Sequence, residues 1–483
     1  MIVSIFTPTP QFANDMADVV RVFFGNIDLR INESGGELAL THTESVAGDA
    51  RQCRIEASGV CAAQAESVRP LYADALEEKR IHKRQLKQGV YAVMKQITGR
   101  TPPWGSLTGI RPTRLLYAGL SQGLTLDEAA RQVQEQFDVQ PEKLSLLREI
   151  VSVQTALPQP GSRDIDLYVG IPFCVSRCAY CSFLSGEVGK GRQLPPYVDA
   201  LEQEIAAALA LIAEKGLRPR AFYMGGGTPT SLPALLLARV LRAARPFIEQ
   251  VSEVTVEAGR PDTIDQDRLL AIRDAGATRI SINPQTMHDE TLRRIGRNHT
   301  TAQTEAAYAL ARKIGFHHIN MDLIAGLPGE DLAMFRQTLA WSRAMAPESL
   351  TVHTLSIKRS SLLHLWEAAL PDGEMTGAMV DAGRESAHER GMRPYYLYRQ
   401  KYMAGNLENV GYALPGHECL YNIGMMEETA HVLAVGAGAI SKRVQPEKGR
   451  IQRAPNVSDI ENYIARVPEM IDRKRQLWDE IWT

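Results

Sequence analysis

Three of the six cysteines in the chain fall within eight residues, in the pattern Cys174-x3-Cys178-x2-Cys181. A disulfide would leave one of these thiols unpaired. A structural zinc site needs four ligands, and the stretch from Asp166 to Met287 contains no His and no further Cys. A thioredoxin-type redox pair would use Cys178 and Cys181 and leave Cys174 without a role. The pattern therefore favours an iron–sulfur cluster, because a four-iron cluster uses all three thiolates and keeps one iron open to a further ligand.

The overall composition indicates a protein without a polyanionic partner. The chain has 483 residues, with 54 Lys and Arg against 56 Asp and Glu, a formal net charge of −2 and 44% hydrophobic residues. This balance gives no general attraction to nucleic acid or to an anionic membrane. No apolar run approaches the roughly 18 residues that span a bilayer, and the N-terminus lacks the basic start and apolar core of a secretory signal. We therefore expect a cytoplasmic, multidomain protein with no nucleic-acid partner and no membrane span.

Short β-branched runs, with helical segments between them, begin directly before the cysteine cluster. They cover residues 167–171, 221–225, 253–257, 278–282, 319–324 and 350–355. This alternation is typical of successive strand–helix units in a parallel α/β sheet, which places its chemistry at the carboxyl ends of the strands. Six such units are too few for a closed eight-stranded barrel. The sequence therefore predicts a partial (β/α)6 barrel.

The flanking regions predict two further domains. Residues 1–160 form an α+β N-terminal domain of unknown role, residues 161–360 form the barrel, and residues 361–483 form a smaller C-terminal domain that covers the substrate. In the N-terminal domain we expect helices over 12–24, 68–98 and 141–155 and from Thr125, and strands over 37–42 and 51–57. The charged run 77–88 is interpreted as a solvated helix face rather than a phosphate site.

Two motifs lie at predicted strand ends. The run Gly225-Gly226-Gly227-Thr228-Pro229 follows the second strand directly. Three glycines let a ligand approach the backbone where side chains would block it, although a tight strand–helix turn also explains them. Glu257 ends the third strand, where a solvated carboxylate and a ligand contact are both open interpretations.

Three polar residues follow in the second half of the predicted barrel. Gln285 lies just past the fourth strand. Asp322 lies inside an otherwise apolar strand, where an unpaired carboxylate is costly to bury, so a role such as binding ribose hydroxyls is favoured. Arg297 is either an exposed helix residue or a clamp for a carboxylate.

Together these motifs resemble a known family. The three-cysteine pattern, with the aromatic Tyr180 before its third Cys, is similar to the signature of the radical S-adenosylmethionine (radical SAM) superfamily. The segments GIPFC, CSF, EAGRPDT, INPQTM and YYLYRQKYMAGN resemble its oxygen-independent coproporphyrinogen III oxidase family, and within it the coproporphyrinogen dehydrogenase subgroup of the HemZ type. The resemblance covers the barrel and the C-terminal domain, roughly two-thirds of the chain, and the N-terminal domain only through GIRPTRL.

The resemblance implies cofactors and roles for particular residues. In that superfamily S-adenosylmethionine chelates the open iron of a [4Fe-4S] cluster, and its reductive cleavage gives a 5′-deoxyadenosyl radical that abstracts hydrogen from the substrate. The resemblance implies that Cys174, Cys178 and Cys181 bind the metal and that Tyr168 and Glu257 are catalytic. It implies cofactor contacts from Tyr180, Gly225, Gly226, Gly227, Thr228, Glu257, Gln285, Arg297 and Asp322. A flavodoxin- or ferredoxin-type protein would donate the electron.

Two positions depart from the pattern of the authentic oxidase. That enzyme has a His two residues before the Pro of IPFC and a fourth Cys two residues after the third cluster ligand. Here Gly170 and Phe183 occupy these positions, while Tyr168 keeps the preceding aromatic residue. The departures leave the cluster pattern intact and bear on substrate handling and on a second S-adenosylmethionine site.

The resemblance implies oxidative decarboxylation of coproporphyrinogen III to protoporphyrinogen IX in haem biosynthesis. Two alternatives stay open. One is a haem-binding chaperone of the same family, with His417 and His431 as candidate haem ligands. The other is a radical SAM group-transfer enzyme that acts on a tetrapyrrole.

The remaining residues that attract attention have simpler explanations. Arg399 and Lys401 could meet the propionates of a tetrapyrrole, although an amphipathic edge of the C-terminal domain explains them as well. Cys53, Cys61 and Cys419 are expected to be structural thiols.

Overall fold

The computed structural model describes residues 1–25, 27–59, 61–109, 111–181, 186–356, 371–400, 403–445 and 450–479. The chain forms two compact units. The first comprises Met1–Arg148 with Arg399–Leu407, and the second comprises Glu149–Tyr398 with the chain from Glu408 onward. The division into three domains at residues 160 and 360 stays a prediction, and each compact unit is described by itself.

The first unit is built on a five-stranded sheet of order β2-β1-β3-β4-β5, in which β1 is parallel to both its neighbours and β3, β4 and β5 are antiparallel. Alternate residues of β3 point inward, and Leu38 and Leu40 join a core that is fully contained in this unit. The strands are β1 (Ile2–Phe6), β2 (Asp28–Ile31), β3 (Leu38–Ala47), β4 (Ala50–Gly59) and β5 (Ala63–Pro70).

The helices α1 (Ala13–Phe24) and α2 (Ala75–Thr98) pack against this sheet. The expected start of the long helix at residue 68 is wrong, because Val68 pairs with Gln52 in β5 and β4. The helix begins only after Asp74, whose carboxylate caps it by accepting a 2.7 Å hydrogen bond from the amide of Glu77. The unit also contains α3 (Thr113–Ser121), α4 (Leu126–Phe137), which begins at the predicted capping box of Thr125, and the start of α5 (Pro141–Ala156).

The second unit is built on an eleven-stranded sheet of order β14-β15-β13-β12-β11-β10-β9-β6-β16-β17-β18. Its centre consists of the six predicted strands, all parallel, which confirms the open (β/α)6 arrangement. These strands are β6 (Asp164–Ile171), β9 (Arg218–Gly226), β10 (Glu253–Glu257), β11 (Arg279–Ser281), β12 (Ile319–Ala325) and β13 (Ser349–Thr354).

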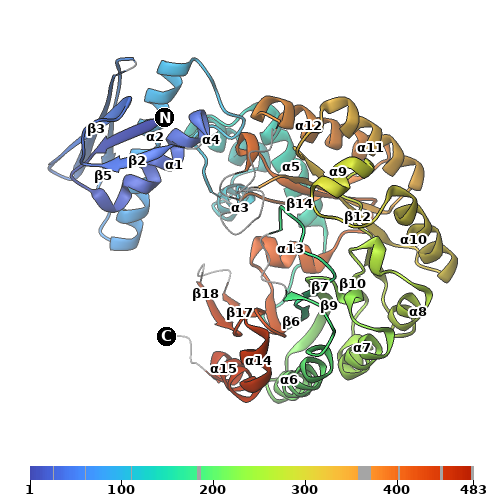
Figure 1. Cartoon of the computed structure of the whole chain (residues 1–483). Helices are drawn as coiled ribbons and strands as arrows, with labels where there is room; N and C mark the ends of the chain where they lie inside the picture. The colour runs from blue at the N-terminus through green and yellow to red at the C-terminus, as the bar shows by residue number, and fades with distance from the viewer. Residues whose placement is uncertain are drawn as a thin grey trace. The chain divides into compact units, whose positions relative to one another are not determined.

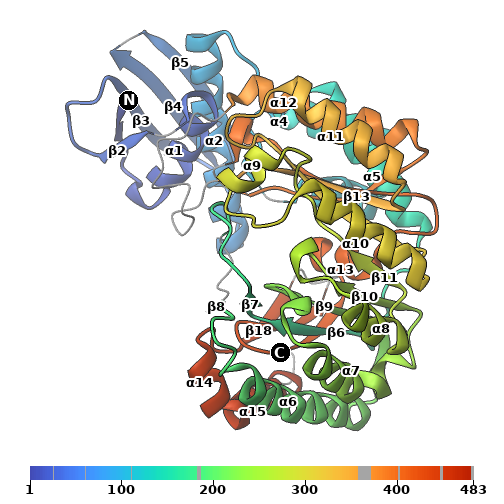
Figure 2. The same ribbon diagram turned by 45° about the vertical axis from the view of Figure 1, so that its right-hand side comes forward.

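Helices follow one another along the outer side of this curved sheet (Figures 1 and 2). They are α6 (Leu194–Glu214), α7 (Ala234–Ile248), α8 (Gln266–Asp274), α10 (Thr301–Ile314), α11 (Leu332–Met345) and α12 (Gly373–Glu389), with the short α9 (Asp289–Arg294) after β11. Such connections are required because parallel strands cannot be joined by tight turns.

The two faces of the parallel sheet differ sharply in polarity. Side chains alternate along a strand, and the parallel register aligns like with like. One face therefore carries buried apolar residues such as Val169, Met224 and Val256. The other face also carries Ala221 and Ile324, but most of its residues are polar or aromatic; they include Asp166, Tyr168, Tyr223, Glu253, Thr255, Glu257, Arg279, Ser281, Asn320, Asp322, Thr351 and His353. This polar inner face is the part of the fold that can hold a cofactor or a substrate.

Strands from the C-terminal part of the chain extend the sheet at both edges. The strands β14 (Arg393–Tyr398) and β15 (Asn409–Ala413) add to β13, and β16 (His431–Val435) adds in parallel to β6. The hairpin of β17 (Ile440–Gln445) and β18 (Arg450–Pro455) follows β16, and the remaining helices are α13 (Leu420–Glu427), α14 (Ile460–Ala465) and α15 (Val467–Asp479). The predicted role of residues 361–483 in covering a substrate stays a prediction.

A buried carboxylate fixes this C-terminal segment to α6. Glu204 is fully buried and accepts hydrogen bonds from the backbone amide of Gly436 at 2.7 Å and from Tyr463 at 2.6 Å. Its other oxygen accepts from Asn456 at 2.7 Å and from Lys474 at 2.5 Å. These four donors compensate the buried charge of Glu204. Loss of one of them would leave the charge partly uncompensated, which is strongly destabilising for a buried carboxylate.

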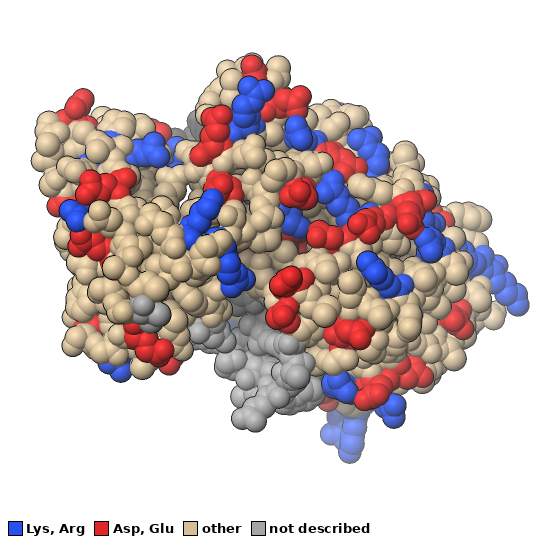
Figure 3. Space-filling view, turned by 90° about the horizontal axis from the view of Figure 1, so that it is seen from above, with Lys and Arg blue, Asp and Glu red and all other residues tan. Residues whose placement is uncertain are grey.

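No helix in the described ranges is long and apolar enough to cross a membrane. On the face shown in Figure 3, acidic and basic side chains are interspersed. The described part of this face carries no patch of a single charge sign.

Candidate functional site

The cysteine loop lies at the carboxyl end of β6. Cys174 ends the short β7 (Phe173–Cys174), which pairs with β8 (Gly186–Glu187), and its thiol lies 3.5 Å from the hydroxyl of Thr228. Cys178 is buried, and Cys174 and Cys181 are half-buried. The loop is anchored on the segment before α10, where the amide of Ala179 donates to the carbonyl of Ile295 at 2.9 Å. The three cysteines therefore lie on one loop at this strand end, and their role as metal ligands stays a prediction.

Two guanidinium groups lie beside this loop. Arg260 is 3% exposed and places Nη1 3.7 Å from Cys178 Sγ, and it also forms a paired salt bridge with Asp262. Arg297 is likewise buried and donates from Nη1 to the carbonyl of Asn283 at 2.5 Å. Burial alone would lower the pKa of Arg297, but Tyr180 and Cys178 raise it above its usual value. Both cations lie where they can balance the negative charge of a group bound by the cysteines.

The glycine run holds the end of β9 against the cysteine loop. The amide of Gly227 donates to the carbonyl of Ile171 at 2.8 Å, and the amide of Thr228 donates to the carbonyl of Phe173 at 2.8 Å. A Cβ atom on Gly227 would lie 2.6 Å from that Phe173 oxygen, and Gly226 has a φ of +111°. Glycine is therefore required here for close backbone packing, which leaves cofactor binding by Gly225, Gly226, Gly227 and Thr228 as a proposal.

Glu257 lies next to a cluster of tyrosines on the polar inner face. Tyr223 donates from its hydroxyl to Glu257 Oε1 at 2.5 Å. The ring of Tyr421 stacks on Tyr223 with 4.3 Å between centroids, and Tyr168 stacks on Tyr421 at 6.2 Å. Burial raises the pKa of Glu257 to about 7 and raises that of Tyr168 above its usual value. A carboxyl that titrates near neutral pH can hold or release a proton in this interior.

Asp322 and Gln285 meet at the centre of the sheet. The amide of Gln285 donates to the carbonyl of Asp322 at 2.9 Å, and Gln285 has a φ of +69°, an uncommon value for a residue with a side chain. The carboxylate of Asp322 accepts from Asn320 at 2.8 Å and lies 3.6 Å from Nε2 of His353. Burial opposes ionisation of Asp322, but hydrogen bonds from His353, Asn320 and Thr351 lower its pKa below the usual value. An ionised acceptor is thus available in the middle of β12.

Several buried polar atoms of the inner face lack an internal partner. Within the described residues, no group forms a hydrogen bond with Ser281 Oγ, Asn283 Oδ1, Arg297 Nε or Tyr421 Oη. Buried polar groups without a partner are uncommon and costly. Ser281 lies on β11, Asn283 follows that strand, Arg297 lies between α9 and α10, and Tyr421 lies on α13. Several parts of the unit thus offer buried donors and acceptors to a polar ligand. The donor set therefore fits a molecule such as S-adenosylmethionine, which carries an amine, a carboxylate and ribose hydroxyls.

The opposite end of the interior is closed by the segment before α13. Arg279 on β11 donates to the carbonyl of His417 at 3.1 Å, and Glu253 on β10 accepts from the amide of Tyr421 at 2.9 Å. Arg279 and Glu253 lie 3.5 Å apart and are both buried. A ligand of the inner face would therefore lie at the other end, beside Glu257, Asp322 and the cysteine loop.

The remaining candidates with described side chains contact other groups. The guanidinium of Arg399 stacks over Trp104 at 4.9 Å and donates to the carbonyl of Leu107 at 2.9 Å. The two ring nitrogens of His431 contact the carbonyl of Ser162 and the amide of Val444, both at 3.0 Å. The ring of His417 packs on His318, with 3.2 Å between their Nδ1 atoms. Phe183, Lys401 and Tyr402 lie outside the described residues.

The position where the authentic oxidase carries His is tightly enclosed here. The carbonyl of Gly170 accepts from the hydroxyl of Tyr197 at 2.7 Å. A Cβ atom on Gly170 would lie 3.3 Å from both the Tyr168 ring and the carbonyl of Val435. Glycine therefore suits the packing between β6 and β16 at this point.

Sequence reasoning missed three residues of this site. Arg260 stands within the EAGRPDT segment, one of those that carry the resemblance, and its proximity to Cys178 depends on the fold. His353 is the partner of Asp322, and the alternation of the strand at 350–355 places it on the polar face. Tyr421 comes from α13, far along the chain, and no local pattern signals its approach to Tyr223.

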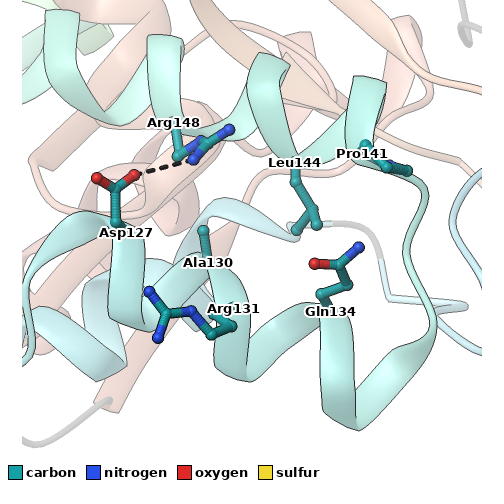
Figure 4. A pocket seen from close by; sticks show the side chains of 7 residues that line it. All are labelled: Asp127, Ala130, Arg131, Gln134, Pro141, Leu144 and Arg148. Carbon is teal, nitrogen blue, oxygen red and sulfur yellow. Dashed lines mark hydrogen bonds and ion pairs between the residues drawn. The ribbon is translucent and has the colours of Figure 1, made fainter.

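A surface pocket of the first unit contains none of these residues. It lies between α4 and α5, where the ion pair of Asp127 with Arg148, at 2.9 Å, borders it (Figure 4). Its lining consists of Asp127, Ala130, Arg131, Gln134, Pro141, Leu144 and Arg148. The pair is exposed, so it adds little binding energy.

Comparison with known proteins agrees with this geometry. The model of the radical SAM superfamily matches residues 168–342. HemZ of Bacillus subtilis, described as an oxygen-independent coproporphyrinogen-III oxidase-like protein, is 40% identical over 397 residues, which cover 80% of this chain and 79% of that protein. The haem chaperone HemW of Escherichia coli is 29% identical over 295 residues, or 60% of this chain and 72% of that protein. The coproporphyrinogen III oxidase HemN of E. coli superposes with a TM-score of 0.50 at 23% identity over 66% of this chain and 72% of that chain, which shows a shared fold.

The parallel sheet and the superfamily match define a radical SAM protein. The chain belongs to the family of oxygen-independent coproporphyrinogen-III oxidase-like proteins that includes HemZ. This confirms the resemblance inferred from the cysteine pattern and the strand-end motifs. It also confirms the predicted cofactors, because the radical SAM superfamily uses a [4Fe-4S] cluster and S-adenosylmethionine.

The raised pKa of Glu257 predicts a pH-dependent stability of the cofactor-free chain. Folding shifts this pKa from 4.5 to about 7, so the folded chain holds a proton that the unfolded chain has lost in that interval. The contribution of Glu257 to the free energy of unfolding is therefore present below pH 4.5 and declines as the pH rises to about 7. In Glu257→Gln the side chain cannot ionise. The free energy of unfolding of this variant, measured with urea, should therefore decline by about 1–3 kcal/mol less than that of the wild type over the same pH interval. Parallel pH profiles of this variant and the wild type would contradict the assignment, and Glu249→Gln on the exposed end of α7 serves as the control.

Proposed function

We propose that this protein catalyses the oxygen-independent oxidative decarboxylation of coproporphyrinogen III to protoporphyrinogen IX. In this reaction each reacting propionate loses one hydrogen atom and CO2, and it leaves one electron for an acceptor as the vinyl group forms. The 40% identity to a coproporphyrinogen-III oxidase-like protein over 80% of the chain is the observation that carries this proposal. A flavodoxin- or ferredoxin-type reductant is part of it.

The positions of the site residues support a role for each within this proposal. Cys174, Cys178 and Cys181 would hold the [4Fe-4S] cluster, with Arg260 and Arg297 balancing its negative charge. When bound, the cluster and S-adenosylmethionine supply one-electron chemistry that generates an organic radical. The chain's own contribution is to orient the cofactor and to exclude water from it.

The strand-end residues would fix S-adenosylmethionine within the inner face. The glycine run with Thr228, together with Tyr180 and Gln285, would line its methionine part, as the resemblance implies. Asp322, ionised beside His353, would accept hydrogen bonds from the ribose hydroxyls. Glu257, with a pKa near neutrality, and Tyr168 beside it would serve proton handling near the substrate.

An anaerobic product assay tests this function. The reconstituted full-length chain, supplied with a reductant and S-adenosylmethionine, should convert coproporphyrinogen III to the divinyl product and form 5′-deoxyadenosine in proportion. Formation of 5′-deoxyadenosine without any vinyl product would show that the substrate is wrong, whereas absence of both would remove the radical assignment. A chain in which Cys178 is replaced by Ala is the blank.

A haem chaperone is the second candidate, because HemW proteins match this chain at 28–29% identity over about three-fifths of its length. Titration of the chain with haem distinguishes the two. A chaperone should develop a Soret band with micromolar affinity. Since both ring nitrogens of His431 are engaged by backbone groups, His431→Ala should leave that band unchanged, while absence of haem binding would exclude the chaperone.

A further inference from the structure

Four side chains with metal-binding atoms converge in the first unit. His42 and Glu44 come from β3, Cys53 comes from β4 and His82 comes from α2. One nitrogen, oxygen or sulfur atom of each lies within 4.8 Å of the corresponding atom of every other. None of the four belongs to the radical SAM site, so the group needs an explanation of its own.

The local fold brings these residues together in a specific way. His42 and Glu44 are two positions apart on β3, so their side chains lie on the same face of the sheet. Glu44 is paired directly with Cys53 across the antiparallel β3–β4 ladder. The helix α2 packs against β4 and β5 of this sheet (Figure 1). It supplies His82, whose ring packs edge-on against Phe12 with 5.1 Å between centroids. The cluster therefore joins two strands to the helix above them.

The potential ligand atoms of the four side chains lie close together, but they do not all form hydrogen bonds with one another. Glu44 Oε2 lies 3.5 Å from His42 Nε2, 2.7 Å from His82 Nε2 and 3.9 Å from Cys53 Sγ. Within the described residues, neither of the two Nε2 atoms has a hydrogen-bond partner of acceptable geometry. The histidines are 2% and 7% exposed, so water does not compensate them. Buried polar atoms in this condition are costly, and a bound cation would satisfy them all at once.

The surroundings prepare these side chains as metal ligands. His42 Nδ1 lies 2.9 Å from the hydroxyl of Thr7, and a proton on Nδ1 that is donated to this hydroxyl leaves the Nε2 lone pair directed at the cluster. The nearby Arg51 pairs through Nη2 with Glu78 at 3.0 Å, whereas its Nε and Nη1 have no hydrogen-bond partner among the described residues.

We propose that His42, Glu44, Cys53 and His82 form a closed four-ligand zinc site that fastens α2 to the N-terminal sheet. Two imidazoles, one carboxylate and one thiolate match the mixed donors that zinc accepts, and the four protein ligands leave no open position, which is typical of a structural site. Tetrahedral zinc holds its ligand atoms roughly 3.3–3.8 Å apart, so only small side-chain movements are required. Cys53 thus gains a role beyond that of a structural thiol, and this site is independent of the proposed function.

Cobalt substitution in the full-length chain tests the site. Replacing Cys174, Cys178 and Cys181 with Ala removes the competing thiols, and the chain is then titrated anaerobically with Co2+. We expect one equivalent to bind with tetrahedral visible bands and a thiolate-to-cobalt charge-transfer band, which Zn2+ displaces. Cys53→Ser should abolish the charge-transfer band, whereas Cys61→Ser, at an exposed cysteine of the same unit, should leave it unchanged.

Metal analysis of the purified chain provides a second measurement that does not depend on a variant. The wild-type chain should carry about one zinc per molecule, and His82→Ala should lower the zinc affinity at least 10- to 100-fold. A titration that yields no charge-transfer band overturns the proposal, and so does a band that survives Cys53→Ser. A chain purified from zinc-containing medium without bound zinc also overturns it.

Discussion

Replacement of Cys178 with Ala is expected to abolish both the iron–sulfur cluster and the cleavage of S-adenosylmethionine. Cys178 is the buried thiol of the three, and the guanidinium of Arg260 lies 3.7 Å from it. A four-iron cluster that is held by only three cysteines is not retained when one of them is removed. Iron should fall from about four atoms per chain to background, and the visible absorbance of the cluster should disappear with it.

The matched control for this prediction is Cys61→Ser, because Cys61 is exposed and lies in the first unit. This variant should keep full iron content and full 5′-deoxyadenosine formation. A four-iron spectrum that persists in Cys178→Ala would refute the assignment of all three thiols. A variant that loses iron but also loses helical circular dichroism would instead be repeated with Cys178→Ser, which preserves the side-chain volume.

The strands of the barrel were predictable because each is a short run of mostly apolar, β-branched residues between helical segments. The six predicted strands overlap the six parallel strands of the sheet, and the three thiols follow the first of them. Parallel strands buried on their outer face carry apolar residues in alternation with polar ones, so Asp322 within an apolar strand was informative about the inner face. These are local properties, which the sequence displays directly.

The parts that could not be predicted depend on long-range pairing. The expected helix start at residue 68 failed because β5 pairs with β4, and only the ladder decides between strand and helix for such a polar segment. The approach of Tyr421 to Tyr223 joins residues almost two hundred positions apart, and no periodicity reports such a contact. The same holds for His82, which meets Glu44 only because α2 crosses the face of the sheet that carries it.

Arg297→Lys is expected to weaken binding of S-adenosylmethionine at least tenfold while the cluster still forms. The Arg297 fork donates to the carbonyl of Asn283 and keeps Nε without a partner among the described residues, so this N–H is available to a ligand. Lysine retains the positive charge but not the planar fork that binds a carboxylate with two hydrogen bonds. Arg293→Lys, on the exposed side of α9, should leave the affinity unchanged. Equilibrium binding to the reconstituted chain measures both variants.

Arg297→Met separates ligand binding from a purely structural role. Methionine removes the charge of Arg297 together with the cost of burying it, and its unbranched side chain can fill the same space. We therefore expect the free energy of unfolding of the cofactor-free chain to change by less than about 2 kcal/mol, while S-adenosylmethionine affinity falls more than in Arg297→Lys. If Arg297 had only a structural role, Arg297→Met would lose much stability. The chains that remain folded would then bind S-adenosylmethionine with normal affinity. Urea unfolding and binding measured on the same preparation decide between the two, because the same side chain cannot give both results.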